Sequence, residues 1–459
     1  MAERTVSVSE VFDSSRFTAY QYMVCGICFL VVLLDGFDLT VAGVALPKIA
    51  DFLHSKPGAL GLALSAGQFG PVIGAFLLGT LADRWGRKWM LLVSALIFGV
   101  FTAMTVTITS VGHLALYRFL AGIGLGGAVP SALALGSEYA PSRSRASLVT
   151  TIYAGIPAGA LVGGLLASWL IPHLGWQSLF VLGGIAPLIL CVIMMFFLPE
   201  SLEFLVRRDK DRARIRRIVS RVSPELGNDN NARFASSAKK LAGVSLKHLF
   251  TEGRALTTIV WWAISILAAY LCWALVSWAP TLLRNAGATV QQYSLAFAAI
   301  MFGSICAAVS IGRLMDKASP LRVLQIGFVL AFFALWVFGL LAGSRSLATV
   351  IAMSIGCGLF IFGAQGGAFA AATLVYPPAI RGTGTGWVYA MGKAGGVIAP
   401  AAGGLLLTLS WSVVKICFWQ AVIALVIAAL LIVFHSHLKR AALEARGAGA
   451  AQAKSATAG

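Results

Sequence analysis

The sequence predicts an all-α polytopic membrane protein in which twelve transmembrane helices form two pseudo-symmetric six-helix bundles. Hydrophobic residues make up 59% of its 459 residues and charged residues 11%, and the mean hydropathy is +0.86. About 20 apolar residues in a helix span about 30 Å of hydrocarbon, and apolar runs of this length recur along most of the chain. Twelve such runs cover residues 20–47, 58–81, 89–109, 112–136, 146–171, 177–198, 257–283, 291–314, 321–342, 346–375, 383–409 and 414–436.

The two halves of the chain share short motifs in the same order, and this repeat predicts the two-bundle arrangement. A parallel repeat of this kind places a substrate site between the bundles, near the middle of the membrane. The matched segments are Gly79–Lys88 with Gly312–Lys317, Pro141–Arg145 with Pro377–Arg381, and Gly163–Leu166 with Gly403–Leu406.

The formal charge is +18, and the distribution of the basic residues along the chain predicts the membrane topology. If the N-terminus is cytoplasmic, most of the 35 Lys and Arg fall in the termini and in the loops on the same side, whereas few lie on the opposite side. This asymmetry follows the positive-inside rule, so both termini are expected in the cytoplasm. The basic residues are then expected to face anionic lipid headgroups, and no nucleic-acid partner is expected.

The same pattern divides the chain into five parts. Residues 1–19 are expected to form a cytoplasmic segment, and 20–198 the first six-helix bundle. A basic cytoplasmic linker with short amphipathic helices is expected at 199–255. The second bundle is expected at 256–437, and the tail at 438–459, rich in Ala and Gly, is expected to be disordered.

Two acidic residues, Asp35 and Asp38, lie in the first apolar run. An ionised Asp at the centre of a membrane helix costs about 2.5–3.5 kcal/mol on insertion scales, so such residues mark functional sites. Their i, i+3 spacing places both on one helix face. Desolvation and like-charge repulsion there favour retention of a proton by at least one of them. The pair is therefore the predicted proton-coupling site, with Gly36 expected to loosen the helix; the alternative is an anchor for helix assembly.

Two basic residues, Arg118 and Lys393, are also expected inside helices. Each needs a partner there, and pairing of Arg118 with Asp35 or Asp38 would lower the cost of burying both charges. Lys393 facing the space between the bundles would attract a carboxylate as a point charge. The alternative for Lys393 is extension of its side chain to the membrane interface.

Aromatic and polar side chains in the apolar runs are candidates for contact with a substrate ring. Gln365, flanked by glycines, is a candidate hydrogen-bonding group. Trp278, near a helix end, is expected to belong to the interfacial aromatic belt instead. The same belt, or ordinary packing, is the alternative for each aromatic candidate. These aromatic candidates are Phe37, Tyr153, Tyr270 and Trp273.

Three motifs resemble the major facilitator superfamily: Gly79-x-x-x-Asp83-Arg84-x-Gly-Arg87-Lys, Arg118-Phe-Leu-Ala-Gly122 and Glu138-x-x-Pro141-x-x-x-Arg145. Further segments resemble its aromatic acid:proton symporter family, whose members import benzoate-like and hydroxybenzoate-like anions in bacteria. These segments are Asp35-Gly-Phe-Asp38, Trp278–Leu283, Gly363–Gly367 and Tyr376–Gly384. The resemblance implies the major facilitator fold and location in a bacterial inner membrane. For Arg118 it implies interaction with the proton site.

The loop motifs are expected to control the conformational change rather than to bind substrate. An acid after the second helix can pair with a helix start in the opposite bundle and hold the outward-facing state closed. The second copy departs from the first at Lys317 and Leu374, so its contact is expected to be weaker; the alternative for both copies is charge that only sets topology. The gating candidates are Gly79, Asp83, Arg84, Arg87, Glu138, Arg145, Gly312, Asp316 and Arg381.

These features favour a secondary transporter that imports a small aromatic carboxylate by proton symport. The alternatives are a proton-coupled exporter of organic anions or drugs, or a membrane sensor of aromatic acids. An enzyme is not expected, because no nucleophile, metal-ligand set or phosphate-binding loop is present. The seven Cys lie in apolar runs and are expected to pack rather than bind metal. The expected partners are the substrate, protons and membrane lipids, without a cofactor or an obligate protein partner.

Overall fold

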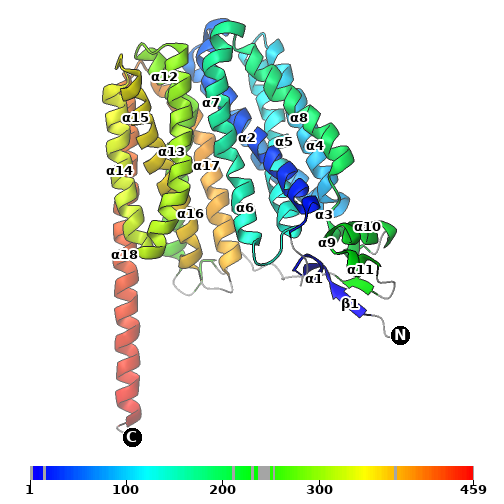
Figure 1. The fold of residues 1–459 in the computed structure, drawn as a ribbon. Helices are drawn as coiled ribbons and strands as arrows, with labels where there is room; N and C mark the ends of the chain where they lie inside the picture. Colours follow the sequence, from blue (N-terminus) through cyan, green and yellow to red (C-terminus); the bar gives the residue numbers. More distant parts are fainter. Residues whose placement is uncertain are drawn as a thin grey trace.

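Twelve helical segments of the protein are long and apolar enough to cross a membrane, within the part of the chain that the structure describes. The structure is a computed structural model, and it describes residues 4–13, 17–208, 212–228, 232–235, 249–251, 254–376 and 380–457. The predicted fold class is confirmed. The segments form two groups that lie side by side, with the first half of the chain on the right in Figure 1 and the second half on the left.

The first bundle contains six membrane spans, one of them interrupted. The span Ser147–Leu174 is made of two helices that meet at Ala154. Directly after the break, Gly155 packs against the backbone of α2 at Phe29 and Leu33. The helices are α2 (Ala19–Leu53), α3 (Pro57–Trp85), α4 (Arg87–Met104), α5 (Val111–Glu138), α6 (Arg145–Tyr153), α7 (Gly155–Leu174) and α8 (Gln177–Phe197).

The second bundle repeats this arrangement, again with one irregular span. The span Leu347–Thr373 contains a π-helical segment, Gly358–Phe362, between two α-helices. Such segments often occur at functional sites. The helices are α12 (Ala255–Asn285), α13 (Val290–Lys317), α14 (Pro320–Leu341), α15 (Leu347–Cys357), α16 (Gly363–Val375), α17 (Arg381–Thr408) and α18 (Val413–Thr457).

Serine side chains cap the starts of the fourth span and of the tenth, which match in the internal repeat. The Ser110 hydroxyl accepts a hydrogen bond from the backbone N–H of His113 at the start of α5, the fourth span. Ser346 does the same for Thr349 at the start of α15, which begins the tenth span. A side-chain oxygen at this position satisfies an N–H group that the helix leaves without a partner. The two matching caps agree with the internal repeat.

Gly36 allows two helices to approach closely. A Cβ atom built on Gly36 would overlap the backbone of Ile156 in α7, and one built on Gly159 would overlap the backbone of Leu33 in α2. Because α2 is continuous from Ala19 to Leu53, the expectation that Gly36 loosens this helix was wrong. Its lack of a side chain serves packing of α2 against α7.

The linker and the N-terminal segment lie together at one end of the bundles, below them in Figure 1. Strands β1 (Arg4–Ser7) and β2 (Ala232–Ala235) pair in parallel, which the sequence did not predict. Asp13 accepts hydrogen bonds from the backbone N–H of Ser142 at 2.6 Å and from its hydroxyl at 2.8 Å. The hydrogen bond from the Ser142 backbone is the main cause that lowers the Asp13 carboxyl pKa. The remaining helices here are α1 (Val8–Asp13), α9 (Leu202–Arg207), α10 (Arg212–Val222) and α11 (Pro224–Asn228).

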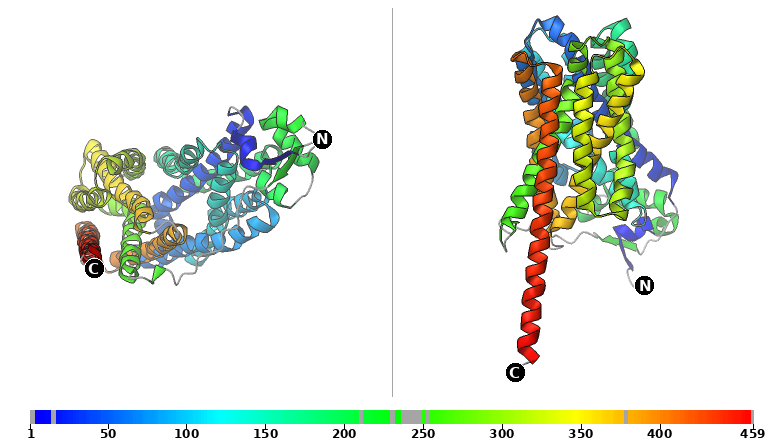
Figure 2. Two further views of the ribbon diagram at one scale, coloured as in Figure 1. Left: turned by 90° about the horizontal axis from the view of Figure 1, so that it is seen from below. Right: turned by 90° about the vertical axis from the view of Figure 1, so that its left-hand side faces the viewer.

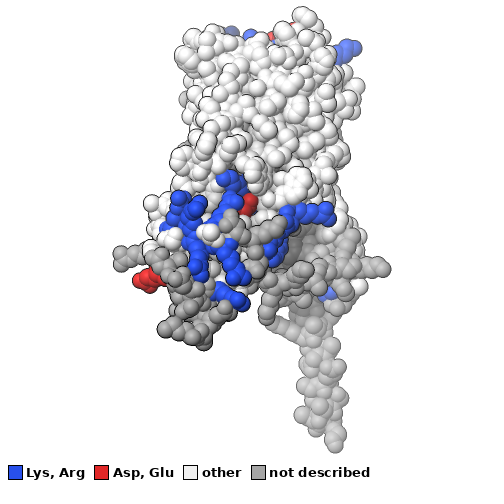
Figure 3. Space-filling view, turned by 90° about the vertical axis from the view of Figure 1, so that its right-hand side faces the viewer, with Lys and Arg blue, Asp and Glu red and all other residues white. Residues whose placement is uncertain are grey.

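We refer to the end that carries both termini and this linker as the basic end, because Lys and Arg gather there in the space-filling view (Figure 3). The other end is called the opposite end. Helix α18 extends beyond the body of the protein on the basic side and is helical to Thr457 (Figure 2). The sequence predicted a disordered tail at 438–459. The abundance of Ala, the strongest helix former, explains why a helix continues there.

Candidate functional site

The two acids of α2 have different environments although they lie one turn apart. Asp38 is fully buried and receives two hydrogen bonds from the guanidinium of Arg118 in α5, one of them 3.0 Å long. The Thr102 hydroxyl of α4 donates to the same carboxylate at 2.8 Å. The Arg118 guanidinium also lies 6.0 Å from the centre of the Phe180 ring. A bidentate, hydrogen-bonded pair of this kind compensates the burial of both charges.

Asp35 has no such partner in its own bundle. Its side chain makes no hydrogen bond within the described ranges, and the residue is 9% exposed. It interacts electrostatically with Lys393 of α17, which belongs to the other bundle, and with Asp38. Of the two pairings that the sequence left open for Arg118, the structure has the one with Asp38. Asp35 therefore remains a buried acid without an ion pair among the described residues, within electrostatic range of a cation of the other bundle.

Two tyrosines meet at the same interface. Tyr153 at the end of α6 and Tyr389 of α17 are each 45% exposed, and their side chains interact with each other. The Lys393 ammonium lies 5.2 Å from the centre of the Tyr389 ring, a cation–π contact. Lys393 is thus directed to the bundle interface rather than to the membrane surface. The sequence predicted Tyr153 and Lys393 but not Tyr389, which no motif or spacing distinguishes.

The other predicted substrate contacts lie in two different environments. Trp273 of α12 is half-buried, and its ring lies against Gly396 of α17, one turn from Lys393. Tyr270, one turn before Trp273 in α12, is also half-buried. Phe37 is 4% exposed and packs against Gly183 of α8 inside the first bundle. This placement directs the Phe37 ring away from the interface that holds Lys393.

Two further predicted residues are on the second bundle. Gln365 of α16 is half-buried and makes no side-chain hydrogen bond within the described residues. Trp278 is buried at 1% exposure, and its indole N–H donates to the backbone oxygen of Pro400 in α17 at 3.0 Å. The expectation that Trp278 belongs to the interfacial belt was therefore wrong, because its polar atom has a partner inside the bundle.

The two bundles are joined by polar contacts at the opposite end. Arg284, at the end of α12, donates to both carboxylate oxygens of Asp51 at 2.7 and 2.8 Å and to the backbone oxygen of Pro47 at 2.7 Å. Both acceptors belong to α2 of the other bundle. The Thr408 hydroxyl of α17 accepts from the backbone N–H of Gly58 in α3 at 2.8 Å. These contacts hold the bundles together at this end.

Ser65 of α3 makes a further contact between the bundles. Its hydroxyl donates to the backbone oxygen of Val397 at 2.7 Å and accepts from the backbone N–H of Ala401 at 3.0 Å. Both backbone groups belong to the turn of α17 that contains Pro400. Proline disturbs the hydrogen bonds of the turn in which it lies. A side chain of one bundle thus satisfies backbone groups of a helix in the other.

Helices α3 and α17 pack closely near the opposite end. A Cβ built on Gly61 would lie 2.5 Å from the backbone oxygen of Pro400 and 3.2 Å from the Cα of Gly404. Near the basic end of the same two helices, a Cβ built on Gly79 or Gly386 would have no atom within 4 Å among those described. The described contacts between α3 and α17 therefore lie toward the opposite end, whereas Gly79 and Gly386 near the basic end have open surroundings.

The predicted gating residues of the first bundle form contacts within that bundle. Arg87 at the start of α4 forms an ion pair with Glu138 at the end of α5, and Ser201 donates a hydrogen bond to the same carboxylate. Glu200 accepts from the backbone N–H of Lys88 at 3.1 Å and of Ser201 at 2.9 Å. Glu200 was missed, although an acid directly after an apolar run is a usable signal. The contacts join α4 and α5 to the linker.

The other gating candidates either have side chains that the structure does not describe or make no ion pair among the described residues. The side chains of Asp83, Asp316 and Arg381, and the surroundings of Gly312, lie outside the described residues. Arg145 is half-buried near Asp13. Arg84 is exposed and makes no ion pair within the described ranges. Among the residues that were searched, no three His, Cys, Asp or Glu side chains come together as a metal site.

An interface between two six-helix bundles, closed at one end and charged at its centre, defines this protein as a membrane transporter rather than an enzyme. Comparison with known proteins agrees. The family model "Major Facilitator Superfamily" matches residues 28–376 and 262–457. The chain is 36% identical to the 4-hydroxybenzoate transporter PcaK of Acinetobacter baylyi, over 89% of this chain and 90% of that protein. It is 30% identical to the benzoate transport protein of the same organism, over 88% of each chain.

Solved structures show the same fold. The D-xylose-proton symporter superimposes with a TM-score of 0.72 at 17% identity, covering 90% of this chain and 97% of that chain. The chain belongs to the major facilitator superfamily and, within it, to the family of 4-hydroxybenzoate-type and benzoate-type aromatic acid transporters. With twelve membrane spans and bacterial relatives, it is a multi-pass protein of the bacterial inner membrane.

Proposed function

We propose that this transporter imports a small aromatic carboxylate, of the hydroxybenzoate or benzoate type, together with a proton. One observation carries the proposal: Asp35 of α2 is buried without a hydrogen-bonding partner among the described residues, and it lies within electrostatic range of Lys393 of α17 in the other bundle. Asp38 is already neutralised by Arg118. The names of the relatives, which include transporters of 4-hydroxybenzoate, gallate and benzoate, support the substrate class.

The orientation follows from charge. The positive-inside rule places the basic end in the cytoplasm. The contacts of Arg284 with Asp51 and of Ser65 with α17 then seal the external side. In this orientation the structure would be an inward-facing state, in which a substrate held near Lys393 would leave toward the cytoplasm.

Coupling arises from competition for one cation. Ionised Asp35 attracts the Lys393 ammonium, whereas protonated Asp35 leaves that ammonium available to a substrate carboxylate. On the cytoplasmic side, loss of the proton restores the attraction between Asp35 and Lys393, and the substrate carboxylate is displaced. One proton accompanies one monoanion, so the step moves no net charge across the membrane. No cofactor is needed for this cycle.

The substrate ring would lie among the aromatic side chains close to Lys393. Trp273 and Tyr270 supply aromatic surface from α12, and Tyr153 and Tyr389 supply it from the facing helices. Offset or edge-to-face contacts between such rings and a benzoate ring are favourable. Gln365 is available to donate a hydrogen bond to a ring hydroxyl or to the carboxylate.

The loop motifs would act when the bundles close at the basic end. Gly79 lies in open surroundings in the present state. Such surroundings are expected of a surface that makes its contacts only in the other state. The remaining candidates with it are Asp83, Arg84, Arg87, Glu138, Arg145, Gly312, Asp316 and Arg381.

The proposal is tested with the Asp35→Asn variant in proteoliposomes. Asparagine resembles the protonated acid and leaves Lys393 free, so exchange of external radiolabelled 4-hydroxybenzoate for internal substrate should continue. Accumulation driven by an inside-alkaline pH gradient should fall to the level of empty liposomes, because the proton-carrying group is absent. A variant that still accumulates substrate as the wild type does would contradict the proposal.

Lys393 variants serve as controls for the substrate side of the same site. Lys393→Arg keeps the charge and should retain pH-driven uptake, whereas Lys393→Gln should lose both uptake and exchange. Loss of both exchange and uptake in Lys393→Gln indicates loss of substrate binding. Loss of pH-driven uptake alone in Asp35→Asn indicates loss of coupling.

A further inference from the structure

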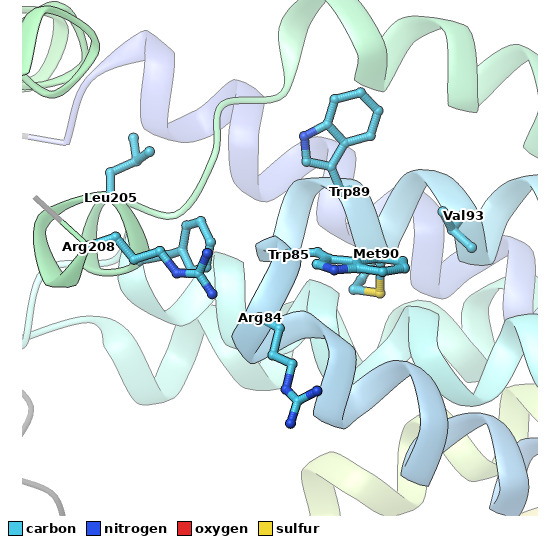
Figure 4. A pocket seen from close by; sticks show the side chains of 8 residues that line it. Arg84, Trp85, Trp89, Met90, Val93, Leu205 and Arg208 are labelled. Carbon is cyan, nitrogen blue, oxygen red and sulfur yellow. The ribbon is translucent and has the colours of Figure 1, made fainter. Parts of the chain in front are cut away.

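A cavity of about 590 Å³ lies at the basic end, outside the interface between the bundles. Its walls come from the end of α3, the start of α4 and helix α9 of the linker with the residue that follows it (Figure 4). The side chains that matter below are Arg84, Trp85, Trp89, Val93 and Arg208. Neither the transport site nor the described contacts between the bundles use this cavity, and of its lining residues Arg84 is also a candidate for the contact that closes the basic end.

Two arginines carry positive charge at this cavity. Figure 4 shows them on different segments, with Arg84 at the end of α3 and Arg208 directly after α9. Arg84 is exposed and forms no hydrogen bond or ion pair within the described part of the chain. The Arg208 guanidinium lies 5.0 Å from the ring centre of Phe204, and its N–H groups donate no hydrogen bond to the residues that the structure describes. By contrast, the neighbouring Arg87 is ion-paired. The cavity therefore offers two guanidinium groups without a protein anion among the described residues.

The rest of the lining is apolar and follows a membrane span. Trp85 and Trp89 are 59% and 54% exposed, and Val93 lies one turn further along α4 toward the middle of the span. Exposed indoles at the end of a span are typical of the membrane interface, where lipid headgroups meet acyl chains. The apolar side of the cavity thus continues into the lipid-facing surface of α4.

We propose that this cavity binds an anionic phospholipid, with its phosphate at Arg84 and Arg208 and an acyl chain along Trp89 and Val93. Guanidinium groups bind phosphate oxygens through charge-assisted hydrogen bonds. The surrounding surface is strongly basic (Figure 3), which favours a lipid with net negative charge over a zwitterionic one. Because Arg84 belongs to α3 and Arg208 to the linker, one bound lipid would join these two segments.

The test measures lipid binding directly. Delipidated, detergent-solubilised full-length protein is titrated with phosphatidylglycerol or with phosphatidylcholine of the same acyl chains, and native mass spectrometry counts the bound lipids. The wild type should bind its first phosphatidylglycerol more tightly than phosphatidylcholine. The double variant Arg84→Gln/Arg208→Gln should weaken that first binding step by about tenfold or more, since each arginine near anionic lipid contributes to affinity.

Arg322→Gln is the matched control, because Arg322 is exposed at the basic end of α14, in the other bundle. It should bind phosphatidylglycerol as the wild type does. Equal binding by the double variant, or equal loss in the Arg322 control, would overturn the proposal. So would binding of sn-glycerol 3-phosphate as tight as that of the lipid, because the acyl chain would then contribute nothing.

A second variant keeps both arginines and tests the apolar side. Phosphatidylglycerol with brominated acyl chains, added at one equivalent, should quench indole fluorescence in the wild type. The Trp85→Phe/Trp89→Phe variant should lose most of this quenching while it retains lipid affinity. Unchanged quenching would place the lipid elsewhere and overturn the proposal even if the arginine variant were unstable.

Discussion

At the scale of single residues, the neighbours of Asp35 and Asp38 give two similar acids different roles. Asp38 accepts hydrogen bonds from Arg118 and Thr102, whereas Asp35 faces Lys393 without a hydrogen bond among the described residues. The sequence identified both acids and both cations. It could not decide which acid pairs with Arg118, because that choice depends on the rotation of α2 against α4 and α5. Thr102 carried no signal, since a threonine in an apolar helix is common.

The hydroxyl pair of Tyr153 and Tyr389 leads to a prediction about substrate affinity. If the two hydroxyls share one hydrogen bond, Tyr153→Phe and Tyr389→Phe should each weaken the apparent affinity for 4-hydroxybenzoate by about two- to tenfold, the range for one hydrogen bond of about 0.5–1.5 kcal/mol. The double variant should be no worse than either single variant, because both remove the same bond. The apparent affinity is measured from initial uptake rates in proteoliposomes over a range of substrate concentrations.

Additive effects of the two Tyr→Phe changes would contradict this pairing and would indicate that each hydroxyl acts alone. A useful control is Tyr22→Phe: Tyr22 is 65% exposed near the start of α2, remote from the interface, and its replacement should leave the apparent affinity unchanged.

At the scale of elements, the sequence predicted which helices exist better than where they are interrupted. All twelve spans were expected, because hydrophobicity over about 20 residues decides them. The break at Ala154 and the π-helical segment Gly358–Phe362 were not expected. Both lie where a helix packs closely on a neighbour: Gly155 meets α2, and Gly358 meets the backbone of Ile300 in α13. Such features depend on tertiary contacts that composition does not reveal.

The close approach of α3 and α17 predicts the effect of one added methyl group. Gly61→Ala places a Cβ against the backbone of Pro400 and should prevent closure at the opposite end. The population should therefore shift toward the state that is closed at the basic end. Spin labels at Thr151→Cys and Arg313→Cys, which are exposed on α6 and α13 near the basic end, should report shorter distances by pulsed electron spin resonance.

The control for this change is Gly26→Ala in α2, where an added Cβ meets no atom within 4 Å. It should leave the distance distribution unchanged and slightly favour the helix, because alanine is a better helix former than glycine. An unchanged distribution in Gly61→Ala would show that the α3–α17 contact does not determine which end is closed.

At the scale of the whole molecule, helices α2, α3 and α7 of one bundle pack against α12, α17 and α13 of the other, so a change of access must rearrange these three helix pairs. Among the described residues, the contact at the opposite end combines one ion pair, a few hydrogen bonds and glycine-lined backbone surfaces. The sequence predicted the two bundles from the internal repeat. It did not indicate which end would be closed. A transporter must adopt both states, so the free energy difference between them is small, and the sequence pattern does not reveal its sign.

The ion pair of Arg284 with Asp51 gives a prediction for the balance of the two states. Arg284→Gln removes the bidentate pair and the bond to Pro47. Since an exposed ion pair contributes at most about 1 kcal/mol, the population closed at the opposite end should fall by about fivefold or less. The same spin-label pair measures it, and Arg345→Gln, which changes another exposed arginine of the second bundle, should have no effect.

The exposure of this pair has a consequence for the conditions under which the protein works. The side chains of Arg284 and Asp51 are 38% and 51% exposed, so dissolved ions reach both. At an ionic strength of about 0.15 M the screening length is about 8 Å, and it shortens as salt rises. Higher salt around the opposite end should thus weaken its closure and change the rate at which the transporter moves between its two states, without a binding site for any particular ion.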